Sequence, residues 1–311
     1  MKTHYAVPAT ASRPAAVVAL SDFDGMLTSH HELLAQAHTA AQEAGLPLMA
    51  GVLWGGASES HAGTVLTPLD ARLALLSQTG LCDSALVLTT APDAASATPA
   101  SLADALRAHV TPGEIMIGAL AAAWGSPEAL ASALTAQGLS AHVLEPLPGV
   151  RRITHEDALA PLLRGDVREV AALLGRLYSV SGIVVPGDRR GRLLGFPTAN
   201  LRLDGRLALP ANGIYAALVA LPGQEAPEAA AVVSLGVRPQ FGEGNPRLFE
   251  VFILDVALDL YGLPIRVYLV ERLRDELKFE SVEALITQMR HDVERSREVL
   301  ALAKIRATSV Q

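Results

Sequence analysis

The chain has 311 residues, half of them hydrophobic and 18% charged, which supplies enough apolar material for two buried cores. Its formal charge is −7, with four basic side chains against twelve acidic ones in the first 150 residues, and neither half is basic enough to suggest nucleic-acid binding. The single cysteine, Cys82, excludes an internal disulfide and favours a reducing cytoplasm. The sequence has no apolar run of about 18 residues, so we expect no membrane span. No long apolar run follows the first residues, so we expect no signal peptide.

The first half of the chain alternates strand-like and helix-like segments. Such alternation predicts a parallel sheet with helices on both faces. Ligands bind to such sheets outside the carboxyl ends of the strands. Strands are predicted over residues 15–20, 48–54, 85–89, 115–118 and 142–144, and helices over about 30–44, 67–80, 101–110 and 126–138. In the helix over 67–80, Thr67 is the expected N-cap and Pro68 stands at the first helical position.

A turn after the first strand holds the first candidate site, a Phe-Asp-Gly run at 23–25. It resembles the opening of the bacterial bifunctional riboflavin kinase/FAD synthetases, in which such a turn leads into a His-x-Gly-His nucleotidyl-transfer signature. Here His30 matches the second histidine, but Leu27 stands at the first histidine and Ser29 at the glycine. A histidine pair stabilises charge on a transferring phosphate better than one histidine and a leucine. The alternative is that His30 and His31 are solvent-exposed residues at a helix start.

The second signature of that family, Ile-Ser-Ser-Thr-x-Ile-Arg, belongs near the end of the same domain. Residues 153–159 stand there and read Ile-Thr-His-Glu-Asp-Ala-Leu, so the serine pair and the arginine are replaced and two acids are present. Acids beside a triphosphate repel it. We therefore expect residues 1–176 to be a Rossmann-like nucleotidyltransferase domain that is degenerate and no longer adenylylates FMN.

From about residue 177 the pattern changes to short apolar runs separated by turns, after a helix predicted over 167–174. Short strands at this spacing indicate a small antiparallel β-barrel, and a long helix over 281–303 is expected to close the chain. The predicted strands cover residues 178–185, 214–220, 230–235, 249–254 and 265–270, and the predicted buried stripe of the helix is Val282, Leu285, Ile286, Met289, Val293 and Leu300.

Residues 191–200, Gly-Arg-Leu-Leu-Gly-Phe-Pro-Thr-Ala-Asn, have the composition of a loop that binds nucleotide phosphates and a metal. Glycines let the backbone approach a ligand closely, and the proline fixes the turn that presents the next residues of the chain. Thr198 and Asn200 share one face of an extended segment and offer hard oxygens, which suit Mg²⁺ carrying nucleotide phosphates.

The three lysines of the chain lie outside any Gly-x-x-x-x-Gly-Lys-[Ser/Thr] motif, so no P-loop lysine is available. Phosphate charge must be met in other ways. We expect Mg²⁺, the backbone amides around Gly187 and Gly191, and the side chain of Arg192 to meet it.

Residues 178–303 carry several motifs that resemble the riboflavin kinase module of the same family, in the same order. They are Gly182-x-Val184-x-x-Gly187, Gly191-Arg192-x-x-Gly195-Phe196-Pro197-Thr198-Ala199-Asn200, Gly236-x-Arg238-Pro239, Glu250, Asp259-Leu260-Tyr261-Gly262 and Leu273-Arg274-x-Glu276-x-x-Phe279. The resemblance implies a riboflavin kinase-type barrel domain over residues 177–311. It also implies ATP as phosphate donor, riboflavin as acceptor, and Thr198 and Asn200 as Mg²⁺ ligands.

Glu250 is the candidate catalytic base. A kinase that acts on an alcohol needs a base near the hydroxyl, and His291 is the only histidine after His155, which makes a histidine base improbable. Glu250 interrupts an otherwise apolar strand, where an acid costs free energy unless it is paired or used. The resemblance implies that it deprotonates the ribityl 5′-hydroxyl. The alternative is an acid at the barrel mouth paired with an arginine.

Three further residues are candidate ligand contacts, either through the resemblance or with a structural role as the alternative. The family uses the segment of Arg274 and Phe279 around the isoalloxazine ring, although a core role for Phe279 is nearly as well supported. Tyr261 either lines the nucleotide pocket or stabilises its own turn.

The sequence departs from the family at Ser234, Gln240 and Phe252, where Asn, Thr and His are usual.

Three functions therefore remain open. The first is an ATP- and Mg²⁺-dependent riboflavin kinase that makes FMN and has lost FAD synthesis. The second is a bifunctional enzyme that makes FMN and then FAD. The third is a non-catalytic flavin-binding protein, which the joint presence of Thr198, Asn200 and Glu250 disfavours.

Overall fold

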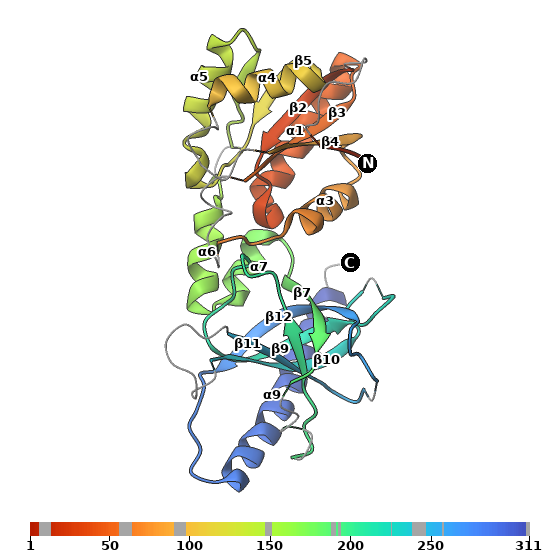
Figure 1. Cartoon of the computed structure of the whole chain (residues 1–311), viewed down its shortest axis with the longest axis vertical. Coiled ribbons are helices and arrows are strands. Elements are labelled where there is room, and N and C mark those ends of the chain that lie inside the picture. The colour runs from red at the N-terminus through yellow and green to blue at the C-terminus, as the bar shows by residue number, and fades with distance from the viewer. Residues whose placement is uncertain are drawn as a thin grey trace. The chain divides into compact units, whose positions relative to one another are not determined.

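The structure is a computed structural model that describes residues 1–5, 14–55, 64–89, 98–146, 151–187, 191, 194–224, 226–237, 247–256 and 258–308. The chain forms two compact units (Figure 1). Unit 1 contains Met1–Ala160, Leu173–Gly175 and Gly205–Ala208, and unit 2 contains Pro161–Ala172, Arg176–Asp204 and Leu209–Gln311. Unit 1 thus includes a short segment after residue 176, and unit 2 includes one before it. The domain boundary expected at residue 176 stays a prediction.

Unit 1 is built on a six-stranded sheet, and all its neighbouring strands are parallel. Their order is β1–β4–β3–β2–β5–β6. The strands are β1 (Lys2–Tyr5), β2 (Ala15–Ser21), β3 (Leu48–Trp54), β4 (Ser84–Thr89), β5 (Thr111–Ile117) and β6 (Ala141–Val143). Parallel neighbours require crossover connections, which helices supply. The predicted α/β domain with a parallel sheet is confirmed.

Helices cover both faces of this sheet (Figure 1). Successive residues of a strand point to opposite faces. Val18 and Leu20 of β2 accordingly pack in the core with α4 and α5, while Val17 and Ala19 pack in the core with α1 and α3. The helices are α1 (Thr28–Ala44), α3 (Leu69–Gln78), α4 (Pro99–His109) and α5 (Pro127–Ala136), and one 3₁₀ turn, η1 (Asp24–Met26), precedes α1.

The helix ends follow capping chemistry in part. Gly45 ends α1 at φ 66°, and the Ser126 hydroxyl accepts the Ala129 amide at the start of α5, as expected. The prediction that Thr67 caps α3 is wrong, because Pro68 occupies the N-cap position. The Thr67 hydroxyl instead accepts the amide of Gly25 at 3.1 Å, which ties α3 to the turn that precedes α1.

Unit 2 contains a closed six-stranded antiparallel barrel in the order β10–β11–β8–β7–β12–β9, with β9 paired back to β10 (Figure 1). The predicted barrel is confirmed, and β8 adds a strand that the sequence pattern did not reveal. The strands are β7 (Tyr178–Val185), β8 (Ala199–Arg202), β9 (Gly213–Ala220), β10 (Ala229–Gly236), β11 (Leu248–Ile253) and β12 (Pro264–Arg274).

The closing helix is α9 (Val282–Thr308), which packs against β9, β10 and β12. Its buried stripe differs from the predicted one. Val282 is exposed, whereas Asp292 and Ser296 are buried beside Leu300. The Ser296 hydroxyl donates to the carbonyl of Ala231 at 3.0 Å, and Asp292 pairs with Arg274, so the helix buries two polar residues that the predicted stripe did not include. Two shorter helices, α6 (His155–Arg164) and α7 (Val167–Leu174), precede the barrel in the chain.

Candidate functional site

Two cavities open on the part of the barrel that the structure describes. The first, which we call the helix-side cavity, has a volume of about 410 Å³. The second, the turn-side cavity, has a volume of about 520 Å³. The helix-side cavity is lined by Gly191, Leu194, Phe196, Thr198, Ile214, Val232, Ser234, Val237, Leu248, Glu250, Phe252, Arg274, Glu276, Leu277, Phe279, Leu285, Met289, Asp292 and Val293, and the turn-side cavity by Val184, Pro197, Thr198, Ala199, Val251, Ile253, Val256, Leu258, Asp259, Leu260 and Tyr261.

Thr198 lines both cavities, so one side chain borders the two. A ligand in either cavity would therefore lie beside this side chain. Both cavities exceed 300 Å³, the lower end of the volumes usual for small-molecule sites at about 300–1,000 Å³.

Strand pairing brings Glu250 and Asn200 together. They are direct partners in the antiparallel pair of β11 and β8, and partners of this kind project from the same face. Phe249 and Val251 are buried on the other face of β11. Because side chains alternate along a strand, the acid that interrupts this apolar run points into the helix-side cavity rather than into the barrel core.

The backbone at Gly187 and Gly191, predicted to meet phosphate charge, lies close to other atoms of the protein itself. A Cβ atom at Gly187 would collide with the side-chain amide of Asn200, and one at Gly191 would collide with the carbonyl oxygen of Phe196. The Gly191 carbonyl accepts the amides of Leu194 and Phe196 at 3.0 and 2.8 Å, which closes the turn before Thr198. Arg192, predicted to meet phosphate charge, lies outside the described residues, as do Arg238, Pro239 and Gln240.

Tyr261 lines the turn-side cavity at the tip of a turn. Its amide donates to the Asp259 carboxylate at 3.2 Å, and Gly262 follows at φ 78°. The carboxylate of Asp259 therefore helps to hold the turn, and Tyr261, which is 45% exposed, contributes to the cavity wall.

Arg274 and Phe279, predicted to contact one ligand, both line the helix-side cavity with Glu250. The structure adds Asp292, which the sequence pattern did not single out because it lies on a predicted helix 18 residues away. Arg274 binds it through two nitrogens, Nε to Oδ1 at 2.8 Å and Nη2 to Oδ2 at 2.6 Å. Phe252, a noted departure from the family, packs edge-on against Phe196, with ring centroids 5.4 Å apart.

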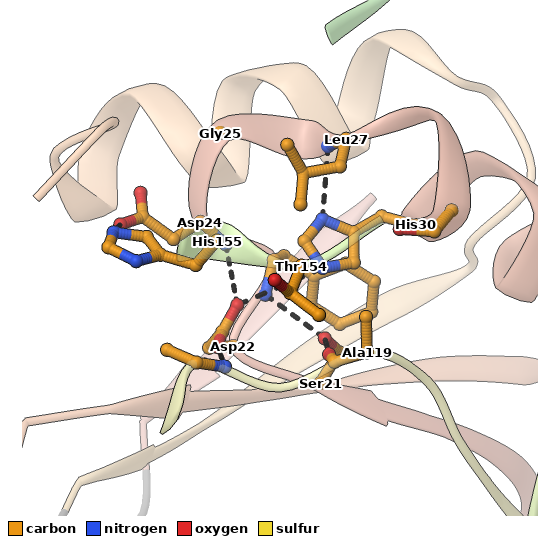
Figure 2. A network of polar contacts seen from close by, with 12 residues as sticks. Ser21, Asp22, Asp24, Gly25, Leu27, His30, Ala119, Thr154 and His155 are labelled. Carbon is orange, nitrogen blue, oxygen red and sulfur yellow. Dashed lines mark hydrogen bonds and ion pairs between the residues drawn. The ribbon is translucent and has the colours of Figure 1, made fainter. Parts of the chain in front are cut away.

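A second polar cluster lies at the carboxyl ends of the strands in unit 1 (Figure 2). Its centre is Asp24, which pairs with Arg72 at 3.1 Å and His155 at 3.3 Å and accepts the amides of Leu66 and Thr67. All three side chains of these ion pairs are at least nine-tenths buried. Asp22 completes the cluster by accepting the amide of Ala121 at 2.6 Å and that of Asp24 at 2.9 Å.

His30 is buried, so the expectation of a solvent-exposed histidine at the helix start is wrong for it and holds only for His31. Its Nδ1 accepts the amide of Leu27 at 3.1 Å, and its Nε2 lies 3.8 Å from Asp22 (Figure 2). Burial lowers the pKa of His30 to about 3, which keeps its imidazole neutral. Sequence reasoning missed this because the ring is covered by segments distant in the chain.

His155 has the opposite charge state. Burial alone would lower the pKa of His155, but the Asp24 and Glu156 carboxylates, 3.3 and 3.7 Å from its ring nitrogens, raise it to about 10. Glu156 is held by that contact and by the amide of Ala122 at 2.7 Å, and its pKa falls to about 2. Glu156, one of the two acids noted in the sequence, therefore contacts His155 and the Ala122 amide inside unit 1.

Two kinds of feature are absent from the described part of the chain. No cluster of three or more His, Cys, Asp or Glu side chains could hold a metal there. None of the described helices is both long and apolar enough to cross a membrane.

Comparison with known proteins places the two cavities in a recognised domain. Residues 174–300 match the family model described as Flavokinase: Riboflavin kinase. The bifunctional riboflavin kinase/FMN adenylyltransferase of Listeria monocytogenes is 33% identical over 150 residues, which cover 48% of this chain and 47% of that protein. The Escherichia coli K12 protein of the same name is 40% identical over 133 residues, covering 43% and 41%. The chain thus spans less than half the length of these curated relatives.

A solved structure resembles a larger part of the chain. A protein described as a macrolide-efflux protein from Streptococcus pneumoniae has a TM-score of 0.74 at 26% identity, covering 96% of this chain and 99% of that one. The likeness of fold therefore includes both units, whereas the family match lies in residues 174–300.

Proposed function

We propose that this chain, whose residues 174–300 match the riboflavin kinase family, transfers the γ-phosphate of ATP to the 5′-hydroxyl of riboflavin and releases FMN and ADP. The observation that carries the proposal is that Thr198 lines two cavities, one of which is also lined by Glu250. A phosphoryl transfer between two bound molecules needs both to meet at one point.

The lining of the two cavities supports an assignment of the substrates. The helix-side cavity presents Phe252 and Phe279 and several aliphatic side chains, which suit the flat ring system of riboflavin. The turn-side cavity presents Pro197, Asp259 and Tyr261, and we assign it to ATP. The γ-phosphate then faces the ribityl end of riboflavin beside Thr198.

Glu250 acts as general base in this proposal. Its carboxylate accepts the proton of the 5′-hydroxyl as that oxygen forms a bond to the γ-phosphorus, while the bond between phosphorus and the β,γ-bridging oxygen breaks and ADP leaves. Ser234 is the partner of Glu250 on β10, and Asn200 is its partner on β8, so Glu250 has a strand on each side. This placement limits the positions that its carboxylate can adopt.

Thr198 and Asn200 fit the hard-oxygen chemistry of Mg²⁺, and we assign them as its protein ligands. Gly187 leaves room for the Asn200 amide. A Cβ atom added at Gly191 would lie 3.7 Å from the Thr198 hydroxyl, so both glycines lie next to the proposed ligands. The bound ion would neutralise charge on the β- and γ-phosphates. Arg192 and the backbone at Gly187 and Gly191 are proposed to contact the same phosphates.

We further propose that unit 1 no longer adenylylates FMN. Leu27 and Ser29 replace a histidine and a glycine of the transfer signature, and Leu27 is buried. The cationic side chain of Arg72 is already paired with Asp24, which leaves less positive charge for a triphosphate.

We also propose a cytoplasmic location, supported by the lone cysteine, and no nucleic-acid partner, supported by the acidic net charge.

Product analysis tests the proposal. The purified chain is incubated with riboflavin, ATP and Mg²⁺, and the flavins are separated by chromatography. FMN without FAD is expected. FAD would support the bifunctional alternative, and riboflavin that binds without turnover would support a non-catalytic flavin-binding protein.

A further inference from the structure

Asp292 is a buried carboxylate on the wall of the helix-side cavity, and the proposed reaction does not use it. Its side chain is 6% exposed, and that of Arg274 is 18% exposed. Besides the two bonds from Arg274, its Oδ1 accepts Nε2 of Gln288 at 2.9 Å. The remaining Arg274 nitrogen, Nη1, donates to the carbonyl of Asp275 at 2.8 Å. The guanidinium is therefore fixed in its plane from two sides.

The pair joins two places that the chain separates by 18 residues, the end of β12 and the N-terminal half of α9. Between them runs the segment 275–281, which supplies Glu276, Leu277 and Phe279 to the cavity wall. Leu277 is 51% exposed, so this segment has little burial of its own to hold it. A contact that closes such a loop reduces the conformations it can adopt.

A buried ion pair is weak evidence for stability, because removing two charges from water offsets most of their attraction. Its better-supported effect is to select one arrangement of the groups around it. Here the groups around it are Arg274, the segment 275–281 and the cavity-facing side of α9, which carries Leu285, Met289 and Val293.

We propose that Asp292 is a positioning residue for riboflavin: through its paired contact with Arg274 it holds Arg274 and the 275–281 segment against the helix-side cavity. This inference rests on the proposed function, since it concerns the flavin substrate of that reaction. The proposed reaction gives neither of its hydrogen-bond partners, Arg274 and Gln288, a role with the phosphate or the proton, so we expect Asp292 to act on binding of the flavin rather than on phosphate transfer.

Steady-state kinetics of Asp292→Asn test the inference. The amide keeps the size of the side chain and removes its charge, and we expect the KM for riboflavin to rise about tenfold, with kcat and the KM for ATP within about twofold of wild type. The dissociation constant for riboflavin, measured by quenching of flavin fluorescence, should rise by a similar factor. A merely structural role gives a different result, because a smaller folded fraction lowers kcat and leaves KM unchanged.

Two further variants complete the test. Asp292→Glu keeps the charge and should restore most of the affinity. Arg295→Gln removes an exposed ion pair with Glu298 on the same helix and should change neither constant. If Asp292→Asn does not fold, Gln288→Leu, which removes the third contact on Asp292, should raise the KM for riboflavin by a smaller factor.

The outcomes separate the inference from the proposed function. A wild-type protein that makes no FMN contradicts the proposed function. An active wild type together with an unchanged KM in the folded Asp292→Asn variant, or in folded Gln288→Leu if that variant replaces it, overturns the positioning role alone.

Discussion

Glu250 of β11 and Asn200 of β8 are direct cross-strand partners, so a carboxylate and an amide 50 positions apart in the chain project from one face of the barrel. Thr198 lies two residues before Asn200 and lines both cavities. The proposed base and one proposed metal ligand, Asn200, are thus positioned by one antiparallel strand pair, and Thr198 lies in the segment that leads into β8. Rigid strands hold such groups more accurately than loops do, which suits a reaction in which geometry supplies most of the rate.

Replacement of Glu250 by Gln should reduce the rate of FMN formation by at least about a hundredfold, because the amide cannot accept the hydroxyl proton. The isosteric side chain leaves the cavity its shape, so riboflavin and ATP should still bind. Turnover under saturating substrates and equilibrium binding of riboflavin are the measurements. Unchanged turnover would remove Glu250 from the role of base.

Thr198→Val replaces a hydroxyl by a methyl group of nearly the same volume. If the hydroxyl binds Mg²⁺, the Mg²⁺ concentration for half-maximal FMN formation should rise about tenfold or more, with riboflavin binding little affected. A Mg²⁺ titration of the initial rate measures the shift. An unaltered metal dependence would show that the metal has other ligands.

Gly191→Ala tests the shape of the phosphate loop. The added Cβ would press on the backbone carbonyl of Phe196, which has no freedom to rotate away, so we expect a loss of about 1–3 kcal/mol in stability and a raised KM for ATP. Gly205→Ala is the matched control, since a Cβ there meets no atom within 4 Å. Thermal unfolding and ATP kinetics of both variants make the comparison. Equal behaviour of the two would contradict the steric account.

The buried histidines of unit 1 predict opposite responses to pH. The pKa of His155 is raised from 6.5 to about 10, so its stabilising contribution is complete below pH 6.5 and is lost as pH rises from there to about 10. The pKa of His30 is lowered to about 3, so unfolding, which lets the ring bind a proton, becomes easier as pH falls from 6.5 towards 3. The groups that face these rings are Asp22, Asp24, Glu156, Arg72 and His31.

His155→Gln should therefore flatten the decline of unfolding free energy between pH 7 and pH 10, and it should lower stability at pH 7 because Asp24 loses a charged partner. Both tryptophans of the chain, Trp54 and Trp124, belong to unit 1, so tryptophan fluorescence during urea unfolding reports on that unit. His142→Gln, at a half-exposed position, is the control. The same alkaline slope in wild type and His155→Gln would contradict the assignment.

Much of the fold could be predicted because hydrophobic periodicity determined it. The strand over 48–54 and the helix over 167–174 have the predicted limits, since each is a continuous pattern bounded by turn residues. Strand β1 was missed because Lys2–Tyr5 is a short polar edge strand, paired on one side with β4. Helix α6 was missed because Pro161 interrupts its pattern.

The candidate site was predictable where chemistry is concentrated in a short motif, as from Gly191 to Asn200. It was not predictable where the partners are distant in the chain. Asp24 meets Thr67 and His155, and Arg274 meets Asp292, only after folding, and no spacing rule links these residues. The same reason explains the error at His30, whose position at the start of a helix indicated exposure while the surrounding segments buried it.

The nucleotide products test the central claim most directly, because the two candidate reactions differ in what ATP becomes. Phosphorylation of riboflavin releases ADP, and adenylylation of FMN releases pyrophosphate. With riboflavin, ATP and Mg²⁺ supplied, we predict one ADP for each FMN formed, and no pyrophosphate or FAD even after FMN is added in excess. Riboflavin left unphosphorylated would contradict the kinase assignment, and pyrophosphate released together with FAD would contradict the loss of adenylyl transfer.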